Sequence, residues 1–155
     1  MELRPLALAK KMKISVVALS VLALALTLSS FAALNVDQNL ASSGTITTSP
    51  NIGVYSDAGC TVNLTSICWG SVAAGGSVSQ TVYVKNTGTG SMTLSLAASG
   101  WSPAGASTYI TVSWNQQNAV LSAGQSVAAV VTVSVSSSIT GISTFSNTIT
   151  ISGTG

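Results

Sequence analysis

Residues 77–96, SVSQTVYVKNTGTGSMTLSL, contain the pattern that decides the expected fold. Apolar side chains alternate with polar ones on both sides of a central Thr-Gly-Thr-Gly: Val78, Val82 and Val84 before it, and Met92, Leu94 and Leu96 after it. Alternation with a period of two is typical of a strand that buries one face. Glycine-rich polar residues between two such runs are typical of a turn. The stretch therefore predicts two strands that pair as a β-hairpin.

The same alternation recurs along most of the chain, and helical periodicity is absent after the first 32 residues. Short strands are expected at residues 45–48, 53–56 and 66–69, and longer ones follow residue 109. The inward residues of these later strands are Ile110, Val112, Trp114, Val127, Val131, Val133, Val135, Phe145, Ile149 and Ile151. Short strands rich in Val, Ile and Thr predict an all-β fold, an Ig-like or jelly-roll-type β-sandwich of about 7–9 strands.

The first 32 residues have the pattern of a secretory signal peptide. MELRPLALAKKMK holds four of the five basic residues, and the apolar run ISVVALSVLALALTL follows it. Small residues then flank a cleavage site after Ala32, so we expect a secreted, extracellular protein that meets the membrane only through its leader. The alternative is an uncleaved anchor, since Ile14 to Ala33 could span a bilayer. A type IV pilin is disfavoured because Lys13 is followed directly by Ile14, without the glycine of that cleavage site.

The expected mature chain divides into an extended segment, residues 33–48, and a sandwich domain, residues 49–155. It carries three charged side chains, Asp37, Asp57 and Lys85. Such a small net charge favours association between copies over binding to nucleic acid.

The residue inventory excludes most chemistry. The chain has no His, and its only Glu is Glu2 in the leader. General acid–base and nucleophilic catalysis need a titratable group beside the reacting atoms, and two Cys alone cannot complete a zinc site. We therefore expect no enzyme activity, no catalytic residues, no metal, no cofactor and no small-molecule substrate.

Cys60 and Cys68 lie in the stretch GCTVNLTSICWG. In an exported chain, a pair at this spacing predicts a disulfide. Between them, Asn63-Leu64-Thr65 forms a sequon, which makes Asn63 a candidate N-glycosylation site.

Three tryptophans raise the question of sugar binding. Trp69 and Trp114 alternate with inward apolar residues, so we expect them in the core. Trp101 is expected in a loop, ASGWSPAG, with no acidic or amide cluster beside it. The sequence therefore does not favour a lectin site.

Several stretches together resemble a known family. NLASSGTITT (39–48), soon after the leader, resembles the "aGtl" stretch near the mature N-terminus of camelysin and TasA-like biofilm-matrix fibre proteins, and VYVKNTGTGSMTLSL (82–96) resembles the N-x-G hairpin of those sandwiches. The mature chain, including GVYSDAGC (53–60), SWNQQNAVLSAGQSV (113–127) and ITGISTFSNTITISGTG (139–155), is similar to the related archaeal bundling-pilus subunits.

The resemblance implies a structural subunit that polymerises head to tail by donor-strand complementation and supports cell adhesion or biofilm. Its partner would be another copy of itself, and filaments could associate further into bundles. We expect the donor strand at residues 33–40, extending as far as Thr48, with Leu34, Val36 and Leu40 filling apolar pockets of the next subunit. The alternative is a monomeric cell-surface or S-layer-associated binding module, in which this strand pairs within its own sandwich.

Overall fold

Alternating apolar and polar side chains form nine strands in the part of the chain that the computed structural model describes, residues 39–48 and 51–155. The strands are β1 (Asn39–Thr48), β2 (Ile52–Tyr55), β3 (Ser66–Ala73), β4 (Ser77–Asn86), β5 (Met92–Ser102), β6 (Ile110–Trp114), β7 (Val120–Leu121), β8 (Ser126–Val135) and β9 (Thr144–Thr154). The expected signal peptide lies outside the described residues, as do Leu34 and Val36.

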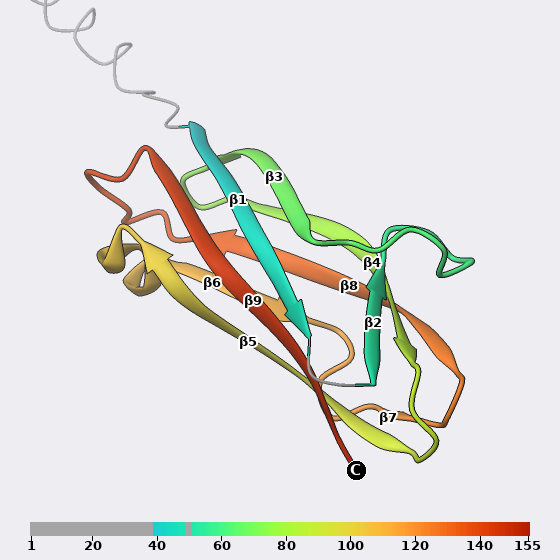
Figure 1. Cartoon of the computed structure of the whole chain (residues 1–155). Coiled ribbons are helices and arrows are strands. Elements are labelled where there is room, and N and C mark those ends of the chain that lie inside the picture. Colours follow the sequence, from blue (N-terminus) through green and yellow to red (C-terminus); the bar gives the residue numbers. More distant parts are fainter. Residues whose placement is uncertain (1–38, 49–50) are drawn as a thin grey trace, which may run out of the picture. The chain divides into compact units, whose positions relative to one another are not determined.

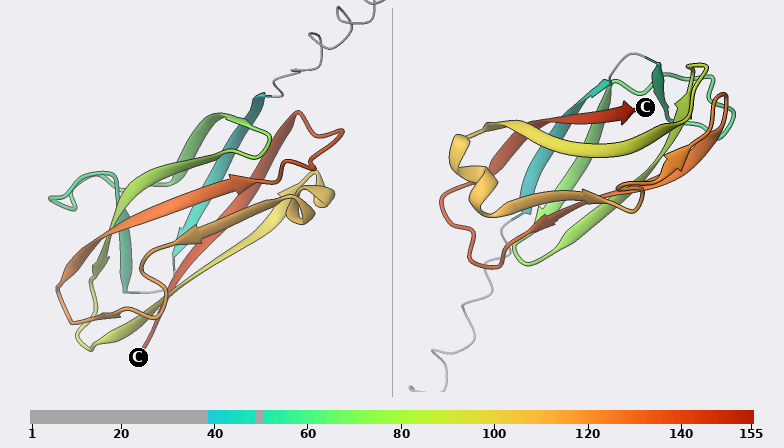
Figure 2. Two further views of the ribbon diagram at one scale, coloured as in Figure 1. Left: turned by 180° about the vertical axis from the view of Figure 1, so that it is seen from behind. Right: turned by 90° about the horizontal axis from the view of Figure 1, so that it is seen from below.

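The strands form two sheets that pack face to face, so the predicted all-β sandwich is confirmed (Figures 1 and 2). One sheet has the order β3-β1-β9-β5-β7 and the other has the order β2-β4-β8-β6. β1 runs parallel to β9, whereas the other strand pairs in the described residues are antiparallel. Both sheets can therefore bury one face while the other meets solvent.

The core lies between the two sheets, and many of its residues are predicted inward ones. Fully or nearly fully buried are Val82, Val84, Met92, Leu94, Ile110, Val131, Val133, Val135, Phe145, Ile149 and Ile151. Five further predicted residues are partly buried and pack against them: Val78, Leu96, Val112, Trp114 and Val127. The period-two pattern therefore identified the buried face of each of these strands correctly.

The predicted hairpin at residues 77–96 is wrong in its pairing. Both strands exist, but β4 pairs with β2 and β8, while β5 pairs with β9 and β7 in the opposite sheet. The Asn86 side chain, which is completely buried, organises the crossing between the sheets. Its amide donates to the carbonyls of Gly90 (2.8 Å) and Leu121 (3.0 Å), and its oxygen accepts from the Gly88 N–H (2.9 Å).

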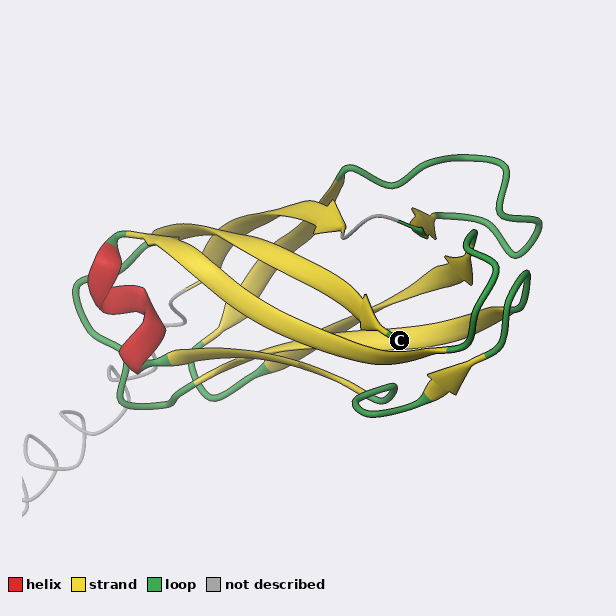
Figure 3. Cartoon of the chain, turned by 60° about the horizontal axis from the view of Figure 1, so that its bottom comes forward, coloured by secondary structure: helices red, strands yellow, loops and turns green. Residues whose placement is uncertain are grey.

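Two short elements were not predicted, and one residue lies elsewhere than expected. β7 has two residues, and η1 (Ala104–Thr108), the 3-10 helix drawn in red in Figure 3, buries Ala106. Trp101 lies in β5 rather than in a loop, and its ring stacks at a tilt on Phe145, with centroids 6.0 Å apart. Such short elements have too few residues to show a period.

The boundary of the sandwich also differs from the expected one. The domain was expected to begin at residue 49, but β1, starting at Asn39, is already an interior strand of the five-stranded sheet. Within the described residues, no helix has the length and apolar character needed to cross a membrane.

Candidate functional site

The most distinctive feature of the described chain is the place that β1 occupies between β3 and β9, which we call the β1 position (Figure 1). Leu40 lies opposite Val72 of β3, and Ile46 lies opposite Ile149 of β9. The Leu40 side chain is fully buried in the core of its own chain. Leu40 was expected to fill a pocket in the next subunit. In the structure it lies in its own sandwich, because β1 pairs on both edges within the chain.

β3 bends where it pairs with β1. The register shifts between Ser42 and Ser43, which lie opposite Gly70 and Cys68, so that Trp69 is the extra residue of a β-bulge. Gly70 has a φ of 71°, a left-handed conformation that glycine adopts without strain. The bulge lets Trp69 keep its side chain inward, and the predicted burial of Trp69 is confirmed at 3% exposure.

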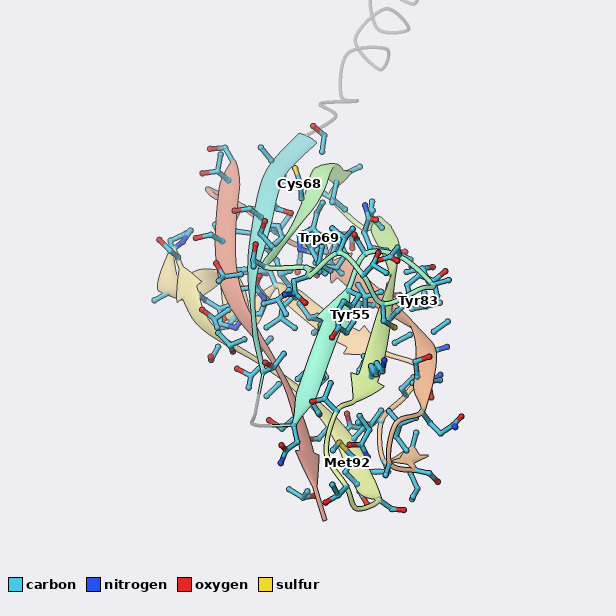
Figure 4. All side chains as sticks on the ribbon, turned by 45° about the vertical axis from the view of Figure 1, so that its right-hand side comes forward. Tyr55, Cys68, Trp69, Tyr83 and Met92 are labelled. Atoms are coloured by element: carbon cyan, nitrogen blue, oxygen red, sulfur yellow. The ribbon has the colours of Figure 1, made fainter. Side chains whose placement is uncertain are left out.

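Three polar side chains lie buried around the middle of β1: Ser42, Trp69 and Asn147. The Ser42 hydroxyl, the Trp69 Nε1 and both polar atoms of the Asn147 amide make no hydrogen bond in the structure. Figure 4 shows Trp69 among the side chains of the interior. A buried polar group without a partner costs about 1–3 kcal/mol, so this group weakens the sheet where β1 sits.

Gly44 lies at the centre of these polar groups. It is paired with Asn147 on β9 and Ile67 on β3. A Cβ at residue 44 would lie 3.1 Å from Ile149 Cδ1, 3.2 Å from Asn147 Oδ1 and 3.5 Å from Trp69 Nε1. Residue 44 therefore faces two polar side chains but has no side chain of its own with which to bind them. We call Ser42, Gly44, Trp69 and Asn147 the Gly44 cluster.

The Gly44 cluster was not predicted, although the sequence contains part of its signal. Asn147 occupies an inward position of the alternating pattern, between Phe145 and Ile149. A polar residue in such a position departs from the pattern of a half-buried strand. Trp69 turns inward at the bulge and approaches Asn147 from the far side of β1. Both features depend on strand order and could not be predicted.

The predicted disulfide is wrong, because both cysteines are free. Cys68 is exposed on β3 and pairs with Ser43 of β1, on the solvent face of the sheet. Cys60 lies in the turn after β2, at a φ of 54°, with its Sγ 4.0 Å from the Ala58 carbonyl oxygen. The backbone geometry of the turn and the strand thus sets the directions of the two thiols separately.

A single carboxylate organises the turn that holds Cys60. Asp57 accepts hydrogen bonds from the Val62 N–H (2.7 Å), the Thr61 N–H (3.0 Å) and the Thr61 hydroxyl (2.9 Å). The Val62 N–H contributes most to holding the pKa of Asp57 below its ordinary value of 3.8. Desolvation opposes this lowering, and the hydrogen bonds from Thr61 add to it. These bonds favour the ionised form.

We expect the turn at residues 57–62 to loosen in acid. Because the pKa of Asp57 is lowered in the folded chain, its contribution is present above the unfolded value near 3.8 and is lost as the pH falls through the lower folded pKa. An NMR titration should show the Asp57 carboxyl changing below pH 3.8 together with the Val62 amide signal. Asp57→Asn should remove this pH dependence. Titration of Asp57 at or above its ordinary value would contradict the prediction.

The remaining predicted residues occupy separate places. Asn63 is exposed and forms an isolated bridge with Tyr55, so the sequon lies on the surface. Trp114 is partly buried against the core, and its Nε1 donates to Gln117 Oε1 at 2.8 Å. Tyr55 and Tyr83 are paired on β2 and β4, as Figure 4 shows.

The described surface offers little for chemistry. Two hollows on it have volumes of about 380 Å³, beside β2 and the end of β1, and about 310 Å³, between β3 and β4. Neither is lined by a carboxylate or a basic side chain. Within residues 39–48 and 51–155, no three metal-ligating side chains lie together. The β1 position is thus the feature that best supports a functional proposal.

Comparison with known proteins adds no relative: no family model, no curated protein and no solved structure matches this chain.

Proposed function

We propose that this chain is a structural subunit of an extracellular pilus or fibre, polymerising head to tail by donor-strand complementation, with a role in cell adhesion or biofilm. The observation that carries the proposal is the β1 position. The first strand of the sandwich lies between β3 and β9, and without it those two strands have no partner on their facing edges. A strand from another copy can supply the same main-chain hydrogen bonds.

The charge distribution supports assembly. The described residues contain two charged side chains, Asp57 and Lys85, both outside β1, β3 and β9. The outer faces instead carry uncharged hydroxyl pairs, such as Thr47 with Thr150 (3.0 Å) and Ser79 with Thr132 (2.8 Å). Soluble monomers commonly carry charged side chains on exposed strand edges, which prevent association, and this chain has very few of them. A heterologous contact that does not close on itself then builds a filament.

One observation favours the alternative, a monomeric surface-attached binding module. β1 pairs on both edges within its own chain, as a self-contained sandwich requires. A subunit could have this closed form before assembly and exchange the strand afterwards. The two functions therefore require the same fold of one copy and differ in whether the copies assemble.

Electron microscopy of the exported protein tests the proposal. The full chain is produced in a host that exports it, and the processed protein is concentrated and imaged by negative stain while its mass is measured by light scattering. Filaments of repeating globular units are the expected result. A preparation that stays monomeric at all concentrations tested would instead favour the surface module.

A further inference from the structure

We infer that the strand exchanged between copies enters the β1 position six residues out of register, so that residues 34–40 of one copy replace residues 40–46 of the next. This inference rests on the proposed fibre function. The acceptor recognises the entering residues through the side chains around Gly44.

The apolar residues of the two segments match in this register. β1 turns Leu40, Ser42, Gly44 and Ile46 inward. With a shift of six residues, the inward positions receive Leu34, Val36, Gln38 and Leu40. The two ends of the segment therefore stay aliphatic. An even shift also keeps each side chain on the same face of the sheet.

The shift replaces the two residues of β1, Ser42 and Gly44, at which buried polar groups have no hydrogen-bond partner. Val36 would replace Ser42, whose buried hydroxyl has no hydrogen-bond partner. Gln38 would replace Gly44, which lies beside the unpartnered Trp69 Nε1 and Asn147 amide. A glutamine amide has an acceptor for the tryptophan N–H and donors for the Asn147 oxygen. The segment before β1 thus complements the Gly44 cluster better than β1 does.

The outward residues and the Cβ position of Gln38 are compatible with this register. Asp37 would take the place of Ser43, which is exposed, so its charge would stay in water. The nearest atoms to a new Cβ at position 44 are the ends of the Ile149 and Asn147 side chains, at 3.1 and 3.2 Å. Side-chain ends can shift by the few tenths of an ångström that this contact needs, whereas backbone cannot do so as easily.

Chain length also favours the shifted register. If β1 itself were exchanged in its own register, residues 49–51 alone would connect two copies, a reach of about 10 Å. With residues 34–40 in the position, the connection comprises residues 43–51 and can reach about 30 Å. The longer connection lets two complete sandwiches lie side by side along a filament without overlap.

Cys68 provides a direct test of the register. It pairs with Ser43 on the exposed face in the described chain, and the shift brings Asp37 of the neighbour to the same place. Two variants are compared in a Cys60→Ser background, Asp37→Cys and Ser43→Cys. Each is exported as the full chain, assembled, oxidised with copper phenanthroline and run on a non-reducing gel. Freshly purified monomer of the Ser43→Cys variant should form the bond within one chain, which verifies the geometry.

The outcomes separate the inference from the proposed function. A ladder of covalent oligomers from Asp37→Cys filaments, with no ladder from Ser43→Cys filaments, is the expected result. A ladder from Ser43→Cys alone, or filaments in which the bond to residue 43 stays within one chain, would overturn the shifted register while leaving the fibre function intact. If neither variant nor the parent chain forms filaments, the proposed function itself fails.

A second comparison tests the role of Gln38. Gln38→Leu keeps the size of the side chain but removes its hydrogen bonds, and Asn35→Leu makes a matched change on the outward face. We expect Gln38→Leu to raise the protein concentration needed for assembly at least about tenfold, which is the effect of losing one of the two hydrogen bonds inferred for its amide. Asn35→Leu should leave that concentration nearly unchanged. Equal effects of the two variants would argue against recognition by the Gly44 cluster.

Discussion

Val36→Asp is expected to abolish filaments while leaving the sandwich folded. On assembly Val36 becomes buried in the next subunit, and an aspartate there would lose its hydration without gaining a partner. Burying an ionised carboxylate in an apolar site costs at least several kcal/mol, enough to cancel the roughly 1.5–3 kcal/mol gained from a buried valine and to oppose the rest of the strand. Electron microscopy and thermal unfolding of the same preparation measure the two effects.

Leu40→Asp is the informative counterpart, because it makes the same chemical change four residues later. Leu40 is fully buried in its own chain, so the aspartate should unfold the monomer as well as prevent assembly. Val36 precedes β1, and the described core is complete from Leu40 onward. Normal filaments from Val36→Asp would show that the donor strand lies elsewhere, and an unfolded Val36→Asp monomer would show that residue 36 belongs to the sandwich.

Asn86→Leu is expected to lower the free energy of unfolding by about 3 kcal/mol or more. The substitution removes three hydrogen bonds from a fully buried side chain and leaves the Leu121 and Gly90 carbonyls and the Gly88 N–H without it. The connection from β4 to β5 would lose the interactions that hold its shape. Chemical denaturation of the variant, followed by tryptophan fluorescence, measures the change.

Asn115→Leu is a matched control for Asn86→Leu. Asn115 is exposed and accepts one hydrogen bond from the Val130 N–H at 2.8 Å. Its loss should cost about 1 kcal/mol or less, since water can replace it. If the two variants lose equal stability, the buried amide of Asn86 does not hold the crossing between the sheets.

Much of the fold could be predicted because burial of one strand face leaves a period of two in the sequence. Val82, Val84 and Leu94 illustrate this, since their alternation placed them in the core and the structure confirms it. The pairing of their strands could not be predicted in the same way. The same alternation is found in a hairpin within one sheet and in a crossing between two sheets. Which of the two forms depends on contacts of Asn86 with residues as distant as Leu121.

The candidate site was predicted less completely. Leu34, Val36 and Leu40 were selected for one shared face, yet Leu40 lies in the core of its own chain and the other two precede the described residues. The cysteine spacing predicted a disulfide, but spacing along the chain says nothing about the direction in which each cysteine side chain points. Cys68 points to solvent from β3, and Cys60 lies in a turn built on Asp57.

By itself, the sequence determined the fold class, the buried face of most strands and the very low charge of the expected mature chain, because each depends on residue type and local period. Only the tertiary structure decided that β1 lies between β3 and β9 and that Ser42, Trp69 and Asn147 gather around Gly44. The physical reason is that strand order depends on pairing between distant segments. Those segments form their hydrogen bonds through the backbone, which is nearly the same for every residue.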